Sequence, residues 1–388
     1  MKKKISIGLQ DFREIIRAWW FYLDKTPKIC KICEDPGIKH YFFARPRRFG
    51  KSITCSVMKH LFLWDRELFQ WLHAYDHRDR TQTYPVIYIS FASWTKESTP
   101  EDFLGDELKI LVDGTQTNLK TYLNGEKLQI EQILKRLLPE LKQKTWREVV
   151  IIIDEYDKPV LTHLSDPVKA EEMRTIFRNL YAPIKDSDQY IRFFWLSWLT
   201  KVMKMNIFSV LNNLRDISLL SGYADLVWFT QDEIENNYAD EIDALVPREW
   251  VNREVIMTKI KERYNGFNFG DDKHTLYNPR DINNLMERGQ FKYYRADTGI
   301  PSGIKEYVET KGSDLEQVVK KIRDRSLWIQ ELDMSLQDLN HIDLAPLFFQ
   351  AWYFTIDYPI GQAYVLKFPN QQADVVFTKY FVELLKPN

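Results

Sequence analysis

The sequence predicts an α/β protein, with helices on both faces of a parallel sheet and a smaller helical or winged-helix-like domain after it. Four short apolar runs, at residues 40–44, 85–92, 148–156 and 191–198, are typical of strands buried on both faces. Helical patterns lie between these runs, and the alternation of strand and helix indicates a parallel sheet. After about residue 231 the sequence changes to a more polar helical pattern.

The elements of the first region follow in a clear order. The run HYFFA at residues 40–44 is the first expected strand, and the helical pattern at residues 52–64 follows it closely. A second helical pattern at residues 130–144 comes before the apolar run that ends near residue 156. Continuous apolar runs of this length, between helices, favour strands in the interior of the sheet.

The second region predicts helices followed by a hairpin. Polar amphipathic patterns place helices at residues 231–245 and 253–264. Residues 353–368 predict a β-hairpin whose turn lies around Gly361, and a last helix is expected at residues 373–385. We therefore expect two domains, with residues 1–230 holding the parallel sheet and residues 231–388 forming the smaller domain.

The totals favour a cytoplasmic protein. Lys and Arg number 54 against 55 for Asp and Glu, so the net charge of −1 produces no field that would demand nucleic acid or an acidic membrane. No apolar stretch approaches the roughly 20 residues of a membrane helix, and no apolar core follows the basic N-terminus. Three cysteines suggest a reducing compartment, and Cys30 and Cys33 offer too few ligands for zinc.

Residues 45–52, RPRRFGKS, end like a phosphate-binding loop, whose usual pattern is G-x-x-x-x-G-K-[ST]. Gly50, Lys51 and Ser52 match the end of the pattern, but Arg45 stands where the first glycine is usual. The loop lies between an expected strand and an expected helix, where free N–H groups and the helix dipole face a bound anion. There Gly50 lets the backbone approach phosphate, Lys51 reaches the β- and γ-phosphates, and Ser52 holds Mg²⁺.

An acidic pair later in the chain supports this interpretation. The apolar run at residues 148–156 leads into Asp154 and Glu155. A strand that delivers an Asp beside the phosphate loop can hold Mg²⁺, and an adjacent Glu can polarise the attacking water. Taken alone, such a pair is also an ordinary strand end. Together with the loop upstream, the pair predicts a nucleotide site.

Six strings carry a resemblance to a known family: YLDKT (22–26), FFARPRRFGKSIT (42–54), VIIIDEYDKPVL (150–161), FSVLNNLRDISL (208–219), YNGFNFG (264–270) and LYNPRDINNL (276–285). From about residue 5 to about residue 375, the chain resembles the AAA-ATPase-like family. In bacteria and archaea this family is often joined to a C-terminal PD-(D/E)xK nuclease-like domain. The resemblance implies that Arg45 is the family's own variant of a true phosphate loop.

The resemblance also implies a P-loop NTPase sheet in which the strand at residues 191–198 lies between the phosphate-loop strand and the Asp-Glu strand. Ser197 would then take the sensor position that monitors the γ-phosphate. With ATP and Mg²⁺ as cofactors, the residues expected in catalysis are Glu155, Lys51 and Ser197, and the expected metal ligands are Ser52 and Asp154. The residues expected to contact the nucleotide are Arg45, Pro46, Arg47, Arg48, Phe49, Gly50, Lys51, Ser52 and Ile53.

Three functions remain open at this point. The leading interpretation is an ATP-binding protein that hydrolyses ATP with Mg²⁺. An alternative is a nucleotide-gated binding module whose C-terminal domain docks DNA or a partner protein with little turnover, but the Asp154-Glu155 pair favours turnover. Direct nucleic-acid binding by RPRR is a third, which the balanced charge disfavours. We find no Asp and E-x-K arrangement of a PD-(D/E)xK nuclease after residue 290, so we expect the nuclease domain to be absent.

The tryptophan and glycine totals are unusual. The chain has 12 Trp and 14 Gly, whereas average usage would give roughly 27 Gly. Six tryptophans stand where the family commonly has glycine, and they are Trp64, Trp71, Trp146, Trp198, Trp228 and Trp352. Such replacements overfill a core or oppose a positive φ. Because some bacterial lineages read UGA as glycine, we expect these six to be glycines misread as tryptophan; the alternative is real divergence.

Overall fold

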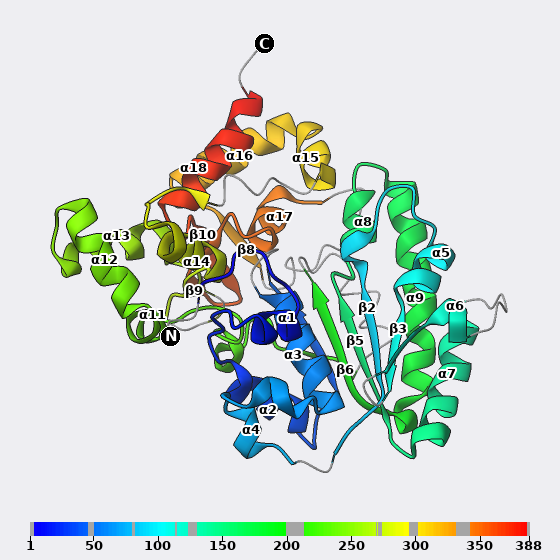
Figure 1. Cartoon of the computed structure of the whole chain (residues 1–388). Coiled ribbons are helices and arrows are strands. Elements are labelled where there is room, and N and C mark those ends of the chain that lie inside the picture. The colour runs from blue at the N-terminus through cyan, green and yellow to red at the C-terminus, as the bar shows by residue number, and fades with distance from the viewer. Residues whose placement is uncertain are drawn as a thin grey trace.

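The computed structural model describes residues 4–45, 50–79, 82–112, 115–122, 130–198, 213–268, 270, 274–294, 302–330 and 342–385. Figure 1 shows a sheet between two layers of helices, with the C-terminal third of the chain gathered at one end of this unit.

Among the described residues, seven strands form the main sheet, in the order β4-β3-β2-β5-β6-β1-β7. Their bounds are β1 His40–Ala44, β2 Val86–Ser90, β3 Lys109–Val112, β4 Thr115–Asn118, β5 Val149–Asp154, β6 Ile191–Trp198 and β7 Arg215–Asp216. The four predicted strands are β1, β2, β5 and β6, and they pair in parallel. Strand β6 lies between β5 and β1, which confirms the position implied by the family resemblance.

The sheet is not wholly parallel, because β3 and β4 add an antiparallel edge that we did not predict. These two strands are only partly buried, so their sequence lacks the continuous apolar run of an interior strand. Asp113 and Gly114 stand between them in the sequence and lie outside the described residues. In a sequence, Asp-Gly is a strong hairpin signal.

The central strands are buried on both faces because successive side chains point to opposite sides of a strand. Ile151 and Ile153 of β5 belong to one hydrophobic core, and Val150 and Ile152 belong to the other. Two groups of helices supply the partners (Figure 1). One group is α1 Phe12–Arg17, α2 Thr26–Glu34, α3 Lys51–Leu63 and α4 Ala74–His77. The other is α5 Pro100–Glu107, α6 Leu119–Tyr122, α7 Ile130–Thr145, α8 Lys158–Thr162 and α9 Pro167–Asp186.

The C-terminal region has the predicted helices and hairpin. Its helices are α11 Gln231–Asn237, α12 Ala239–Glu249, α13 Arg253–Tyr264, α14 Pro279–Arg288, α15 Ser302–Glu309, α16 Gly312–Arg323, α17 Leu344–Gln350 and α18 Gln371–Tyr380. Strands β9 Thr355–Ile360 and β10 Ala363–Lys367 form the hairpin, and β8 Trp328–Gln330 pairs with β10. Short 3-10 helices are η1 Arg66–Phe69, η2 Phe91–Ser93, η3 Asp188–Tyr190, η4 Ser221–Tyr223 and η7 Val382–Leu385.

The C-terminal region packs on two different cores. Helices α11 to α14 form a separate core, whereas α15 to α18 share the core on the α7–α9 face of the sheet. Contact between α15 and α8 is close, because a Cβ built on Gly303 would lie 1.8 Å from the carbonyl oxygen of Leu161. The domain division at residue 230 stays a prediction.

Composition also raised the questions of the cysteine pair and of membrane-spanning helices. Cys30 and Cys33 are both buried on α2 with free thiols. Throughout the part of the chain that the structure describes, helices fall short of the length and apolar character that crossing a membrane requires.

Candidate nucleotide site

The site begins where strand β1 meets helix α3. Strand β1 ends at Ala44 and α3 begins at Lys51, which gives the predicted order of strand, loop and helix. Gly50 is the residue before the helix and has a φ of +88°. Only glycine adopts this conformation without a steric penalty from Cβ. Four of the predicted nucleotide-binding residues lie outside the described residues, namely Pro46, Arg47, Arg48 and Phe49.

Asp154 connects three elements at the end of the sheet. The Ser52 hydroxyl, in the first turn of α3, donates a hydrogen bond to Asp154 Oδ2 at 2.6 Å. From the neighbouring strand β6, the Ser197 hydroxyl donates to Asp154 Oδ1 at 2.5 Å. The backbone N–H of Glu155 also donates to Oδ1, at 3.0 Å. Three predicted site residues, Ser52, Asp154 and Ser197, therefore form one connected group.

Burial controls the charge of this group. Asp154 and Ser197 are fully buried, and Lys51 is only 4% exposed. Desolvation is the largest influence on Asp154 and raises the pKa of its carboxyl, and the nearby charge of Glu155 raises it further. Lys51 and the two serine hydroxyls act in the opposite direction. Because a buried carboxylate needs compensating charge, this position favours a cation beside Asp154.

The oxygen atoms of Ser52 and Asp154 suit Mg²⁺. Magnesium prefers oxygen ligands and is commonly held by one or two carboxylates together with waters and substrate phosphates. The described residues contain no group of three or more His, Cys, Asp or Glu that could hold a metal by themselves. The donor set therefore fits a Mg²⁺ ion that arrives with a phosphate, and not a cation held by protein carboxylates alone.

Glu155 has an unusual backbone. Its φ is +52°, a value that is uncommon for a residue other than glycine. Backbone strain of this kind concentrates at functional sites, where the surrounding structure holds it in place. In this chain the strained residue directly follows Asp154, so the turn after β5 places Glu155 at the same edge of the sheet as the start of α3.

Arg45 is fully buried, and its described contacts are with other residues of the protein. Its guanidinium donates to the carbonyl oxygens of Ala44 at 2.9 Å and Ser218 at 2.5 Å, and it lies 4.5 Å from the ring centroid of Phe43. Burial lowers the pKa of Arg45 to about 9. Ile53 is half-buried against the core under α3. The described contacts of Arg45 and Ile53 thus hold the loop to the protein, and their contact with nucleotide stays a prediction.

Ser218 is a site residue that the sequence argument did not single out. Its hydroxyl accepts a hydrogen bond from the N–H of Ala44 at 2.9 Å, while its carbonyl accepts from Arg45. Ser218 therefore fixes the start of the phosphate loop from the segment after β7. Ser218 lies in the string FSVLNNLRDISL, which carries part of the family resemblance, and this position could have indicated a role for it.

A polar cavity of about 280 Å³ lies beside Ser52. It runs along the sheet face between α3 and strands β2 and β3. Its walls include Asp11, Ser52, Ser56, Lys59, Tyr88, Ser90 and Lys109. The two lysines give this space a cationic lining, partly balanced by Asp11, whose Oδ2 lies 3.5 Å from Lys59 Nζ.

Comparisons with known proteins identify the family of the chain. Residues 6–208 match the sequence model of a family described as Predicted AAA-ATPase. The chain is also 32% identical over 378 residues to a protein of Azotobacter chroococcum mcd 1 described as an uncharacterized protein in the vnfD 5′ region. That alignment covers 95% of this chain and 68% of the relative.

Proposed function

Because the chain belongs to the Predicted AAA-ATPase family, we propose that it binds MgATP at the start of helix α3 and hydrolyses it. The observation that carries this proposal is the hydrogen bond of 2.6 Å from Ser52 to Asp154, residues 102 positions apart in sequence. The fold brings a loop hydroxyl to a buried carboxylate at the edge of a parallel sheet, where ligands bind in open α/β folds.

In this proposal, each residue acts on a different part of the ligand. Gly50 lets the backbone N–H groups approach the phosphates, and Lys51 places a positive charge on the β- and γ-phosphates. Ser52 and Asp154 would hold Mg²⁺, which when bound neutralises charge on the phosphates. The loop residues Arg45, Pro46, Arg47, Arg48, Phe49 and Ile53 complete the proposed binding set.

Glu155 is the proposed general base, because it follows the metal-binding Asp154 and can polarise water near the γ-phosphate. Ser197 is the proposed sensor of the γ-phosphate. Two observations support its role: strand β6 lies between β1 and β5, and the Ser197 hydroxyl bonds to Asp154 at 2.5 Å. Through that bond, Ser197 also orients Asp154.

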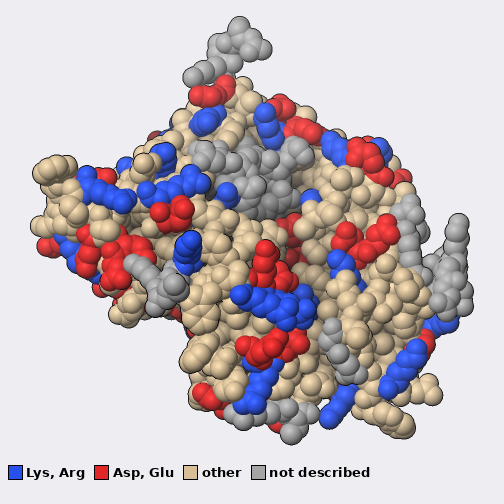
Figure 2. Space-filling model, in the orientation of Figure 1, with Lys and Arg blue, Asp and Glu red and all other residues tan. Residues whose placement is uncertain are grey.

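The gated-module alternative has one observation in its favour. Helix α15 of the C-terminal region touches α8 at Leu161, and α8 begins at Lys158, shortly after Glu155. A partner bound to the C-terminal region would therefore act on an element next to the proposed base. On the face drawn in Figure 2, basic and acidic side chains are interspersed, which gives no support to nucleic-acid binding by charge alone.

The test combines binding and turnover. In a calorimetric titration, Lys51→Ala should lose tight MgATP binding while its circular dichroism spectrum stays unchanged. Glu155→Gln should bind MgATP normally and hydrolyse it at least about tenfold more slowly, because removing a general base typically lowers rates 10²–10⁴-fold. Unchanged affinity of Lys51→Ala would contradict the site. Tight binding by the unaltered protein without turnover would favour the gated module.

A further inference from the structure

Five tryptophans have a left-handed backbone. Their φ values are +57° at Trp19, +54° at Trp64, +57° at Trp146, +56° at Trp250 and +63° at Trp352. In the described part of the chain, the other non-glycine residues with positive φ are Glu155 and Arg325. Positive φ is uncommon outside glycine, and a bulky residue there is a true outlier. Five such outliers of one residue type require a common cause.

All five tryptophans lie at the C-terminal end of a helix, three directly after it and two, Trp19 and Trp352, one residue further on. They follow α1, α3, α7, α12 and α17, in that order. This is the position where helices most often place a left-handed residue, which is usually glycine. These five tryptophans therefore share one backbone role, and that role usually belongs to glycine.

Helix α3 shows the hydrogen bonds of this role. The N–H of Trp64 donates to the carbonyl of Leu61 at 3.2 Å, and the N–H of Asp65 donates to the carbonyl of His60 at 3.1 Å. This pair of bonds defines the Schellman motif, whose left-handed residue is Trp64. The same pair closes α1 through Trp19 and Trp20, and α17 through Trp352 and Tyr353.

A glycine in the same chain provides the comparison for Trp146. Gly289 ends helix α14 with a φ of +63°, and its N–H donates to the carbonyl of Leu285 at 2.7 Å. Trp146 makes the equivalent bond to the carbonyl of Lys142 at 2.8 Å. The two helices end in the same way, and one of them has the residue that this conformation favours.

Trp352 is buried in a core and Trp64 packs against the same core, but packing does not account for Trp146 and Trp250. Trp146 is 88% exposed and Trp250 is 92% exposed, so their indole rings bury little apolar surface that would offset the backbone strain. Selection for a side chain is therefore a poor explanation at these two positions. A residue with no side chain meets every requirement that the backbone imposes there.

We infer that the source gene specifies glycine at positions 19, 64, 146, 250 and 352, through UGA codons that its cell reads as glycine. Three of these positions were expected from the family comparison, and Trp19 and Trp250 are new. Trp71 and Trp228 do not have a positive φ, and Trp198 lies in strand β6. For these three, the backbone adds no support, and glycine there stays a prediction. This inference does not depend on ATP binding.

The direct test is the nucleotide sequence of the source gene. We expect UGA at all five positions, and UGG at Trp94, Trp195 and Trp328, which lack a positive φ. UGG at the five positions would overturn the inference. Mass spectrometry of the protein from its own cells gives a second test, since its peptides should contain glycine at residues 146 and 250.

A stability measurement tests the physical argument separately. In urea unfolding, Trp146→Gly and Trp250→Gly should each raise the folding equilibrium constant about five- to thirtyfold, because the left-handed conformation disfavours an L-residue by about that factor. Trp328→Gly is the matched control, because Trp328 is also exposed but lies in strand β8. The control should lower the constant, since glycine weakens a strand. A decrease for Trp146→Gly and Trp250→Gly would contradict the inference.

Discussion

The residues at the two ends of helix α3 have the same left-handed backbone conformation but differ in side chain, since one is glycine and the other is tryptophan. Gly50, before its first turn, has a φ of +88°, and Trp64, after its last turn, has a φ of +54°. At the end of the helix, the two hydrogen bonds of the Schellman motif require the left-handed conformation, and at the start Gly50 has the same conformation. The difference teaches that the fold sets the backbone conformation, and the residue then decides how much free energy that conformation costs.

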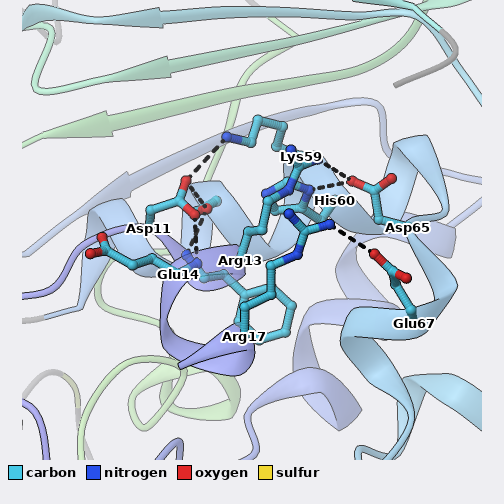
Figure 3. A network of polar contacts seen from close by, with 10 residues as sticks. Asp11, Arg13, Glu14, Arg17, Lys59, His60, Asp65 and Glu67 are labelled. Atoms are coloured by element: carbon cyan, nitrogen blue, oxygen red, sulfur yellow. Dashed lines mark hydrogen bonds and ion pairs between the residues drawn. The ribbon is translucent and has the colours of Figure 1, made fainter. Parts of the chain in front are cut away.

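The two ends also differ in how they are held. At the start, the Ser52–Asp154–Ser197 group connects the helix to the sheet. At the end, a network of Asp11, Arg13, Lys59, His60 and Asp65, the anchor network, connects α3 to α1 and η1 (Figure 3). We therefore expect changes at the start to affect nucleotide binding and changes at the end to affect stability.

The largest combined effect, on MgATP affinity and on stability together, is expected from Gly50→Ala. A Cβ at this position would meet only ordinary contacts, 3.6 Å from the carbonyl of Val227, so the penalty is conformational. We expect the free energy of unfolding to fall by about 1 kcal/mol and MgATP affinity to fall at least about tenfold. Calorimetry and urea unfolding measure the two. Gly312→Ala is the control, since Gly312 lies in α16 without a positive φ or a close neighbour; it should leave MgATP affinity unchanged and should not lower the free energy of unfolding, because alanine favours a helix.

The next effect is expected from Asp65→Ala, at the other end of the helix. Its carboxylate lies 2.6 Å from His60 Nδ1 and accepts from Arg13 Nη2 at 2.9 Å. Removing it leaves the buried His60 ring without this partner, so the free energy of unfolding should fall by about 1–3 kcal/mol. MgATP affinity should stay the same. A loss of affinity as large as that of Gly50→Ala would show that the two ends are not independent.

His60 makes the anchor network sensitive to pH. Burial is the largest influence and lowers the pKa of His60 below its ordinary value of 6.5, although Asp65 opposes this. The unfolded chain therefore takes up a proton below about pH 6.5 that the folded chain does not. The free energy of unfolding should fall as pH drops through this range, by up to about 1.4 kcal/mol per pH unit for this group.

His60→Gln tests that pH dependence. Its free energy of unfolding, measured between pH 7 and pH 5, should fall less steeply than that of the unaltered chain. Some slope should remain, because burial also lowers the pKa of His40 and His163. An identical slope in both proteins would exclude His60 as a source of the pH dependence.

The smallest effect is expected from Arg17→Ala. Arg17 pairs with Glu67 at 2.9 Å beside the anchor network, but the two side chains are 61% and 73% exposed. Exposed ion pairs contribute little because water screens them and both side chains lose mobility. The free energy of unfolding should change by less than about 0.5 kcal/mol, and a change as large as that of Asp65→Ala would contradict this view.

Features that leave a strong local pattern in the sequence were predictable, and features that depend on distant pairing or weak patterns were not. Strands β1, β2, β5 and β6 were predictable because burial on both faces leaves a continuous apolar run. The position of β6 beside β1 came only from the family resemblance, since no local pattern specifies which distant strands pair. The antiparallel β3–β4 edge was missed because half-exposed strands carry a weak pattern.

At the site, the residue types and order of Ser52 and Asp154 were sufficient to predict that the two lie together, whereas the position of Ser197 came only from the family resemblance. The burial of Arg45 was not predictable. An arginine in a phosphate loop is expected to face the phosphate, and the Ser218 carbonyl that accepts its hydrogen bond is remote in sequence. Trp19 and Trp250 were missed because the prediction rested on positions where the family commonly has glycine. Their place just after a helical segment was a physical signal already present in the sequence.

The pairing of β1 has a consequence for protein synthesis. Within the described residues, β1 pairs with β6 and β7, and Ala44 is aligned with Trp198. At a translation rate of about 5–20 residues per second, roughly 150 residues of delay leave the strand HYFFA without its neighbours for about 8–30 s. During that time an apolar strand edge is exposed on the nascent chain. Ribosome-bound chaperones that cover such segments should therefore influence the yield of folded protein more than they influence its final stability.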